Sequence, residues 1–264
     1  MTIIALLTDF GTKGQHYVAS MKGVILKINP KAQIVDISHN ITPYAVIEAA
    51  YALKSTYPHF PEGTVFVVVV DPGVGTSRDI LAIKTKSNYY FIGPNNGIFH
   101  NALEFDTISE CVKITNDKYF NKPVSNMFHG RDIMAPVAAH LTNGVSFYDF
   151  GDQFDLEGHV NHPIVLEKIS DNKIKCTIQY MDEFGNVITN LRGDSFSLRE
   201  GQVLKLKHRR NEYRGNFSSC FASVPKNSLL FLVGSSGFLE ISKNQGNAAK
   251  DLDLNVGDVV EITL

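Results

Sequence analysis

One short run, VFVVVV at residues 65–70, constrains the fold more than any other part of the sequence, because all of its side chains are apolar. A strand with one face in water alternates polar and apolar residues, so an unbroken apolar run predicts a strand that is buried on both faces. Both faces of a sheet are covered when helices connect parallel strands. The run therefore favours a mostly parallel sheet with helices packed on each side.

Strand and helix patterns alternate throughout the N-terminal half of the chain. IIALLT at 3–8 and QIVDIS at 33–38 have the composition of short buried strands, and apolar residues at helical spacing lie between them. Thr42 and Pro43 are typical of the first turn of a helix, which we expect to continue into YAVIEAAYALKSTY. Further strand and helix patterns follow, and together they predict an α/β domain at residues 1–150.

The composition changes after about Tyr148. GDQFDLEGHVNHP at residues 151–163 is polar and contains two glycines, which is typical of a linker. The strand patterns beyond it are short, lie at hairpin distances and include IVLEKI, KIKCTIQYM, VLKLKH, SLLFLV, FLEIS and VVEITL. Because helical periodicity is almost missing there, we expect a small antiparallel sheet or barrel at residues 164–264.

Charge and cysteine content restrict the cellular setting. The formal net charge of -2 gives no support for nucleic acid or an anionic membrane as a partner. The three cysteines, Cys111, Cys176 and Cys220, form no CxxC pair, which favours free thiols in a reducing compartment over disulfides or a zinc site. The first residues lack a basic leader, and their apolar run is too short for a signal peptide or a membrane span. We expect a soluble, cytoplasmic protein.

Two aspartates follow predicted parallel strands at the carboxyl end, where open α/β sheets bind their ligands. Asp9 follows IIALLT, Asp71 follows VFVVVV, and a glycine-containing turn leads from Asp71 to Arg78. Either aspartate could instead cap a turn or the following helix, because aspartate is common in both places. The residues alone favour a polar site at this edge of the sheet and leave a structural role for each acid open.

FHGRDIMAP at residues 128–136 adds a histidine, His129, on a loop directly before a predicted helix. Histidine can exchange a proton near neutral pH, whereas arginine only orients or neutralises an anion. A surface hydrogen-bonding role for His129 remains open, as does a metal site formed by Asp9, Asp71, His129 and Asp132. The sequence contains no GxGxxG, Walker A, HExxH or GxSxG motif, so it gives no support for a phosphate loop, a zinc protease or a serine hydrolase.

An ordered set of short motifs spans both predicted domains. The motifs are TDFG, YVASMKGVI, DISHNITP, VVVDPGVGTSR, GPNNG, FHGRD, DEFGNVITN and SSGFLEIS. In this order they resemble the S-adenosyl-L-methionine (SAM) hydroxide adenosyltransferase family, formerly a domain of unknown function, which is related to the bacterial fluorinase and chlorinase. The resemblance extends from Thr8 to about Ala249. It implies a Rossmann-like N-terminal domain, a C-terminal β-barrel, and a homotrimer with sites at the subunit interfaces.

The resemblance also implies a reaction, in which water attacks C5′ of SAM and releases adenosine and L-methionine without a cofactor or a metal. It implies that Asp71, Arg78 and His129 activate the water, and that Asp9 binds the ribose. The other substrate-binding residues that it implies are Tyr44 near the nucleoside, Phe184, Asn186 and Phe221 around the adenine, and Asp182, Ser235 and Ser236 at the methionine end.

Two features favour water over halide as the nucleophile. Asp71 stands where the halogenases have a tyrosine, and a carboxylate would repel a halide ion. The long insertion of the halogenases is also missing, since only KTKSN links two predicted strands after Asp79. The segment after TDFG departs from the family pattern, because TKGQHY lacks the acidic residue that is common in relatives. Three alternatives stay open: a nonenzymatic SAM or adenosine binding protein, a SAM-dependent halogenase, and a metallohydrolase that uses the same acids.

Overall fold

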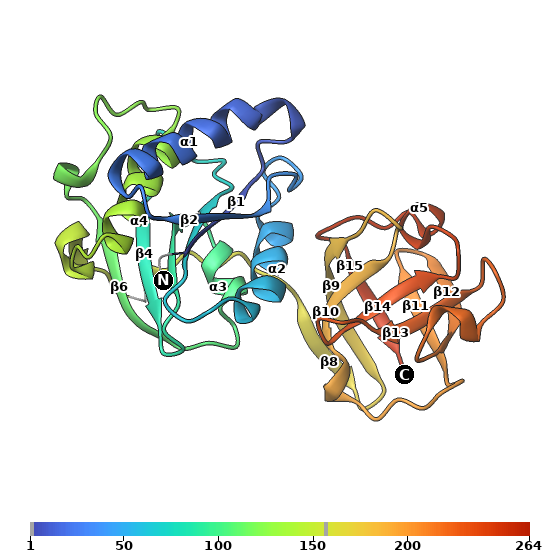
Figure 1. Ribbon diagram of the computed structural model, residues 1–264. Helices are drawn as coiled ribbons and strands as arrows, with labels where there is room; N and C mark the ends of the chain where they lie inside the picture. Colours follow the sequence, from blue (N-terminus) through green and yellow to red (C-terminus); the bar gives the residue numbers. More distant parts are fainter. Residues whose placement is uncertain (1–2, 156–157) are drawn as a thin grey trace. The chain divides into compact units, whose positions relative to one another are not determined.

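The computed structural model describes residues 3–155 and 158–264 (Figure 1). The chain divides into two compact units, Met1–His162 and Pro163–Leu264. The first unit combines a sheet with helices, and the second consists mainly of strands. The predicted combination of an α/β unit with a β-barrel is therefore confirmed. Among the described residues, no helix has both the length and the apolar character that crossing a bilayer requires.

A seven-stranded sheet forms the centre of the first unit. Its strands are β1 (Ile3–Thr8), β2 (Gln33–Ser38), β3 (Val65–Val69), β4 (Ile80–Thr85), β5 (Tyr90–Pro94), β6 (Ile108–Ile114) and β7 (Gly151–Gln153), in the spatial order β2-β1-β3-β5-β4-β6-β7. The first four in this order are parallel, whereas β4, β6 and β7 pair in the antiparallel sense. β4 and β5 are antiparallel because a short turn joins them, and a parallel pair would need a long crossover.

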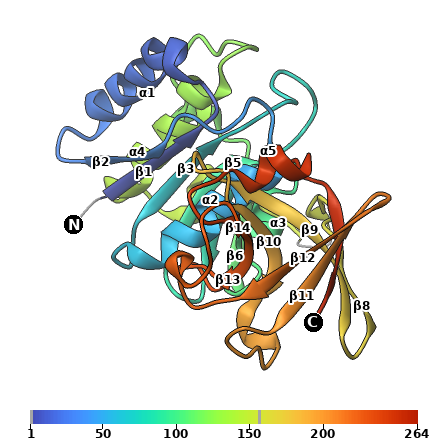
Figure 2. The same ribbon diagram turned by 90° about the vertical axis from the view of Figure 1, so that its right-hand side faces the viewer.

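Helices cover both faces of this sheet (Figure 2). They are α1 (Gln15–Ile28), α2 (Val46–Thr56), α3 (Ile98–Ala102) and α4 (Ala135–Thr142), and a π-helical turn, Gly130–Met134, leads into α4. Along β3, Val65, Val67 and Val69 pack with α1 and α4 on one face. Phe66 and Val68 pack with α2 and α3 on the other. The prediction that the apolar run is buried on both faces is confirmed.

One helix boundary differs from its prediction. The sequence predicts a helix start at Thr42, but α2 begins at Val46. Two hydrogen bonds hold the intervening residues in a loop: Thr42 N donates to Glu48 Oε1 at 3.1 Å, and Tyr44 N donates to Asp9 Oδ2 at 2.8 Å. Tyr44 also has a φ angle of 68°, which a right-handed helix does not allow. The loop thereby reaches the end of β1.

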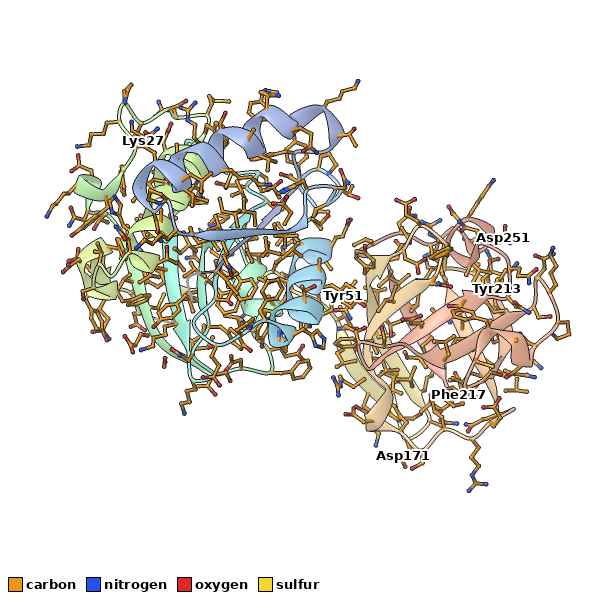
Figure 3. The ribbon with its side chains drawn as sticks, in the orientation of Figure 1. Lys27, Tyr51, Asp171, Tyr213, Phe217 and Asp251 are labelled. Carbon is orange, nitrogen blue, oxygen red and sulfur yellow. The ribbon has the colours of Figure 1, made fainter. Side chains whose placement is uncertain are left out.

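The second unit is a barrel of seven strands with one further strand outside it. Its elements are β8 (Leu166–Ser170), β9 (Lys173–Met181), β10 (Val187–Arg192), β11 (Val203–His208), β12 (Asn211–Phe217), β13 (Leu229–Val233), β14 (Phe238–Lys243), α5 (Ala248–Leu252) and β15 (Val259–Thr263). β10 pairs with both β14 and β9, which closes the ring, and β8 adds to β9. Ile178, Leu206 and Phe231 fill the interior, and Tyr213 on β12 packs against it (Figure 3).

The segment predicted as a linker, residues 151–163, is partly tied to the first unit. Its first three residues form β7 and pair with β6. Residues 156–157 lie outside the described part of the chain. Beyond them, Asn95 Nδ2 donates to the carbonyl of Gly158 at 3.0 Å, and the amide of Val160 donates to Asn95 Oδ1 at 2.9 Å. The loop GPNNG therefore has a structural role, since it holds this segment in place.

Candidate active site

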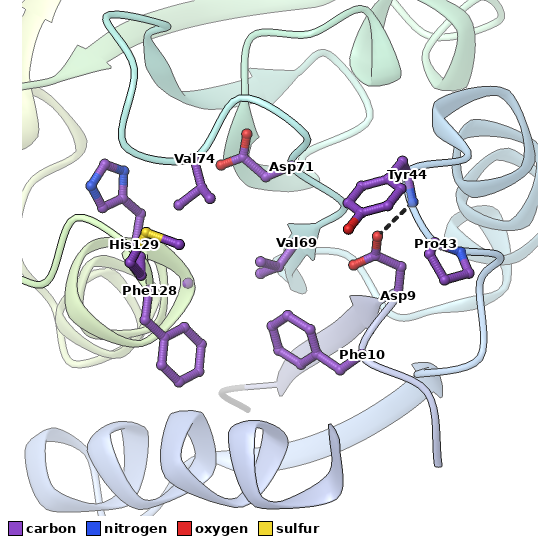
Figure 4. Close-up of a pocket in the computed structure, with 11 residues that line it drawn as sticks. Asp9, Phe10, Pro43, Tyr44, Val69, Asp71, Val74, Phe128 and His129 are labelled. Carbon is purple, nitrogen blue, oxygen red and sulfur yellow. Dashed lines mark hydrogen bonds between the residues drawn. The ribbon is translucent and has the colours of Figure 1, made fainter. Parts of the chain in front are cut away.

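A pocket opens at the carboxyl ends of β1 and β3 (Figure 4). It has a volume of about 330 Å³. The residues that line it include Asp9, Phe10, Tyr44, Asp71, Phe128 and His129. They come from the ends of two strands, from the loop before α2 and from the loop before α4. The two phenylalanines were not predicted as site residues, because apolar side chains beside strands resemble core residues.

Arg78 joins Asp71 and His129 in one hydrogen-bonded group. Arg78 Nε lies 2.9 Å from each carboxylate oxygen of Asp71, and Arg78 Nη2 donates to Asp71 Oδ2. The same Nη2 donates to His129 Nδ1 at 2.9 Å. Only 5% of the Asp71 side chain and 11% of the Arg78 side chain are exposed. Three residues that the sequence separates by up to 58 positions thus share one half-buried site.

The glycine-rich turn after β3 makes this arrangement possible. Gly75 has a φ angle of 78°, and a Cβ at this position would lie 2.6 Å from the backbone oxygen of Asn126. A Cβ on Gly73 would lie 3.2 Å from Arg78 Cγ. The absence of both side chains lets the turn bring Arg78 back onto Asp71 and approach the loop before α4.

The protonation state of His129 follows from its partners. A guanidinium group can only donate, so His129 Nδ1 accepts from Arg78 and the neutral ring carries its hydrogen on Nε2. Burial, and after it the positive charge of Arg78, lowers the pKa of His129 below the ordinary value of 6.5, although two nearby carboxylates oppose this shift. At neutral pH the ring is therefore uncharged and can donate a hydrogen bond through Nε2.

A buried carboxylate fixes the loop that carries His129. Asp132 is fully buried and accepts hydrogen bonds from Asn121 Nδ2 at 2.8 Å, Ser125 N at 3.0 Å and Arg131 Nε at 2.7 Å. Burial raises the pKa of Asp132, but these hydrogen bonds outweigh burial and lower it. The carboxylate stays ionised and holds both ends of the loop.

The acids that the sequence offered as metal ligands have protein partners instead. Arg78 binds both oxygens of Asp71, and Arg131 binds both oxygens of Asp132. Over residues 3–155 and 158–264, no three His, Cys, Asp or Glu side chains gather in a way that could hold a metal ion. A reaction without a metal stays a prediction, which chelation can test.

Asp9 and Tyr44 form a second polar feature of the same pocket. Tyr44 N donates to Asp9 Oδ2 at 2.8 Å (Figure 4), and Tyr44 itself is 71% exposed. Burial raises the pKa of Asp9, and the hydrogen bond from Tyr44 opposes this shift. The Asp9 carboxylate is thus held in place on the pocket wall, where it can accept hydrogen bonds from hydroxyl groups.

The residues predicted for the adenine lie together in the second unit. Phe184, Asn186 and Phe221 line one pocket of about 660 Å³, and Phe184 is 79% exposed. Asp182 lines a separate pocket of about 490 Å³. The Asp182 carboxylate accepts from Phe184 N at 3.0 Å and from Asn186 Nδ2 at 2.8 Å, so it also shapes the turn that carries the aromatic ring. Gly185 supplies the positive φ of 82° that this turn needs.

Ser235 and Ser236 lie in the turn between β13 and β14 and line neither of these two pockets. Beside this turn is Glu240, which the sequence analysis missed. Its Oε1 lies 1.7 Å from the place that a Cβ on Gly234 would occupy, so the Glu240 side chain packs directly against this glycine. Burial, and after it the negative charge of Asp182, raises the pKa of Glu240 to about 7. The feature of the sequence that could have identified Glu240 is a charged residue within the strand pattern FLEIS.

Comparisons with known proteins agree on one family. Models of the SAM hydroxide adenosyltransferase N-terminal and C-terminal domains match residues 4–151 and 176–261. A protein named (R)-S-adenosyl-L-methionine hydrolase from Methanocaldococcus jannaschii is 38% identical over 272 residues, which cover 99% of this chain and 96% of the relative. A protein of the same name from Thermus thermophilus is 32% identical over 99% of this chain and 100% of its own length.

A more distant relative and a solved structure also match the chain over nearly its full length. A fluorinase from an Actinoplanes species is 27% identical over 99% of this chain and 97% of its own length. The crystal structure of an uncharacterized conserved protein from Thermotoga maritima has a TM-score of 0.92 and 38% identity, and covers 99% of this chain and 100% of that chain. The chain therefore belongs to the SAM hydroxide adenosyltransferase family.

Proposed function

We propose that the protein hydrolyses SAM to adenosine and L-methionine by attack of water at C5′. The observation that carries this proposal is the hydrogen-bonded group of Asp71, Arg78 and His129 on a pocket at the carboxyl edge of the sheet. The names of the full-length relatives support it and specify the (R) epimer at sulfur, which we propose as the preferred substrate here.

The difficult part of SAM hydrolysis is the activation of the nucleophile, not the departure of the leaving group. A sulfonium leaves as a neutral thioether, so the departing group needs no general acid. Free water has a pKa of about 15.7 and attacks a saturated carbon poorly. The site therefore has to hold one water in line with the C5′–S bond, about 3 to 3.5 Å from carbon, and accept its proton.

In the proposed mechanism, Asp71 accepts the proton of the attacking water. Its carboxylate keeps lone pairs that Arg78 does not use, whereas His129 Nδ1 already accepts from Arg78. His129 donates through Nε2 and orients the water oxygen, and Arg78 holds the two groups in register. As the C5′–O bond forms, the C5′–S bond breaks, its electron pair stays on sulfur, and one proton leaves by way of Asp71 to solvent.

The remaining residues bind substrate in this proposal. Asp9 accepts hydrogen bonds from the ribose hydroxyls, and Tyr44 packs near the nucleoside. Phe184, Asn186 and Phe221 hold the adenine, and the methionine end is bound by Asp182, Ser235 and Ser236. We further propose an α/β catalytic domain at residues 1–150, a barrel domain at 164–264 that completes the site, a homotrimer with sites at subunit interfaces, and a cytoplasmic location.

Incubation of the purified protein with SAM, followed by chromatography, tests the function. Adenosine and methionine should accumulate in equal amounts, faster from the (R) epimer than from the (S) epimer. Parallel reactions with added chloride or fluoride separate hydrolysis from halogenation, because a halogenase would form 5′-halo-5′-deoxyadenosine. Tight binding of SAM without any product would identify a binding protein and refute the proposal.

A further inference from the structure

Three aromatic rings pack against one another at the edge of the pocket. Phe10, Tyr17 and Phe128 meet edge to face, with ring centroids 5.6 Å apart for Phe10 and Tyr17, 5.8 Å for Phe10 and Phe128, and 5.4 Å for Tyr17 and Phe128. Phe10 and Phe128 line the pocket together with Asp71 and His129 (Figure 4). We call these three residues the aromatic wall.

The backbone fixes the position of Phe10 within this wall. A Cβ on Gly14 would lie 2.7 Å from Phe10 Cβ and 3.3 Å from Tyr17 Cδ2, so the turn before α1 packs closely against both residues. Phe128 already has a cation near its ring, since Arg131 Cζ lies 5.0 Å from the ring centroid. Tyr17 does not line the pocket, so Phe10 is the ring of the wall that we consider for a cationic ligand.

The proposed reaction presents a cation to this pocket. In an in-line displacement the attacking water and the leaving sulfur lie on opposite sides of C5′, so the sulfonium is held away from Asp71 and His129. The face of an aromatic ring attracts a cation, and the attraction is lost once the sulfur becomes a neutral thioether.

We infer that the aromatic wall, through Phe10, recognises the positive charge of the substrate's sulfonium and distinguishes SAM from neutral thioether nucleosides. The inference rests on the proposed function and deepens it, because it assigns a specificity-determining residue to the same pocket. Removal of the ring face should weaken binding of a cationic ligand about three- to tenfold more than binding of a neutral one.

Two ligands that the enzyme cannot hydrolyse test this inference by calorimetry. Sinefungin carries a charged amine at the place of the sulfonium, and S-adenosylhomocysteine carries a neutral thioether there. The measured quantity is the ratio of their dissociation constants, for the wild type and for Phe10→Leu, Phe10→Met and Phe10→Tyr. Met127→Leu is the matched control, because Met127 lines the same pocket and has no aromatic ring.

The expected result is a loss of charge discrimination in Phe10→Leu and Phe10→Met, with discrimination retained in Phe10→Tyr and Met127→Leu. The affinity for S-adenosylhomocysteine shows whether each variant is correctly folded. If the branched leucine does not fit beside Gly14, Phe10→Met still tests the removal of the ring. An unchanged ratio in the variants without a ring, or an equal loss in Met127→Leu, would overturn the inference. Turnover of SAM by the wild type is measured separately. If the ringless variants lose charge discrimination but the wild type does not hydrolyse SAM, the proposed function is refuted and the inference about Phe10 stands.

Discussion

Replacement of Asp71 by asparagine separates proton transfer from substrate binding. Asparagine keeps the shape of the side chain, and its amide oxygen can still accept one hydrogen bond from Arg78. The amide nitrogen, however, would face Arg78 Nη2 or Nε, so one donor would meet another where a charge-assisted bond now exists. The site would lose its proton acceptor, while Asp9 and the pocket walls stay unchanged.

The size of the effect follows from these contacts. Loss of a positioned general base lowers a rate by about 10²- to 10⁴-fold, or ~3 to 5 kcal/mol in the barrier. The lost hydrogen bond to a charged group costs about 1.5 to 3 kcal/mol of folding stability, because only 11% of the Arg78 side chain is exposed. The dissociation constant for adenosine should change by no more than about threefold, since Asp71 is not assigned to the nucleoside.

The assay is single-turnover formation of adenosine from SAM, with calorimetry of adenosine binding and a melting curve on the same preparations. Asp79→Asn is the matched control, because Asp79 lies next to Arg78 in the sequence and pairs with Lys113 at 2.6 Å outside the pocket. We expect Asp79→Asn to keep the wild-type rate. A wild-type rate in Asp71→Asn would remove Asp71 from the mechanism.

Three further predictions concern His129, pH and metals. His129→Asn, whose amide can still bond to Arg78, should keep about tenfold more activity than His129→Ala; equal rates would mean that the ring itself takes the proton. Because the pKa of His129 is lowered from 6.5, its neutral form persists below that pH, so kcat/KM should be level above pH 6.5 and fall only as the medium becomes more acidic. A profile that still rises above pH 7 speaks against this protonation state. Exhaustive dialysis against a chelator should leave kcat unchanged, and recovery of a lost rate with added zinc or magnesium would show that a metal is needed.

The overall fold could be predicted largely from the apolar patterns. The run at residues 65–70 predicted a strand buried on both faces, and the structure divides its side chains between two cores. The start of α2 was not predictable, since the bond from Tyr44 N to the Asp9 carboxylate joins residues 35 positions apart. Local helix signals carry no information about such a contact.

The residues alone predicted a polar site at the carboxyl edge of the sheet, but the roles proposed for them came only from the order of the motifs. Asp71 and His129 have ordinary structural roles when each is considered alone, and only the fold brings both within reach of Arg78. Phe10 and Glu240 escaped notice for a related reason. The role proposed for Phe10 and the raised pKa of Glu240 both depend on residues that are distant in the sequence.

The source of the oxygen in the product tests the central claim most directly. The protein is incubated with SAM in water enriched in oxygen-18, and the adenosine is analysed by mass spectrometry. Attack of water at C5′ predicts one labelled oxygen, located in the 5′-hydroxyl group, in a fraction of the adenosine that equals the oxygen-18 enrichment of the water. Adenosine without the label would contradict the account, because the bond to C5′ would then have come from another nucleophile.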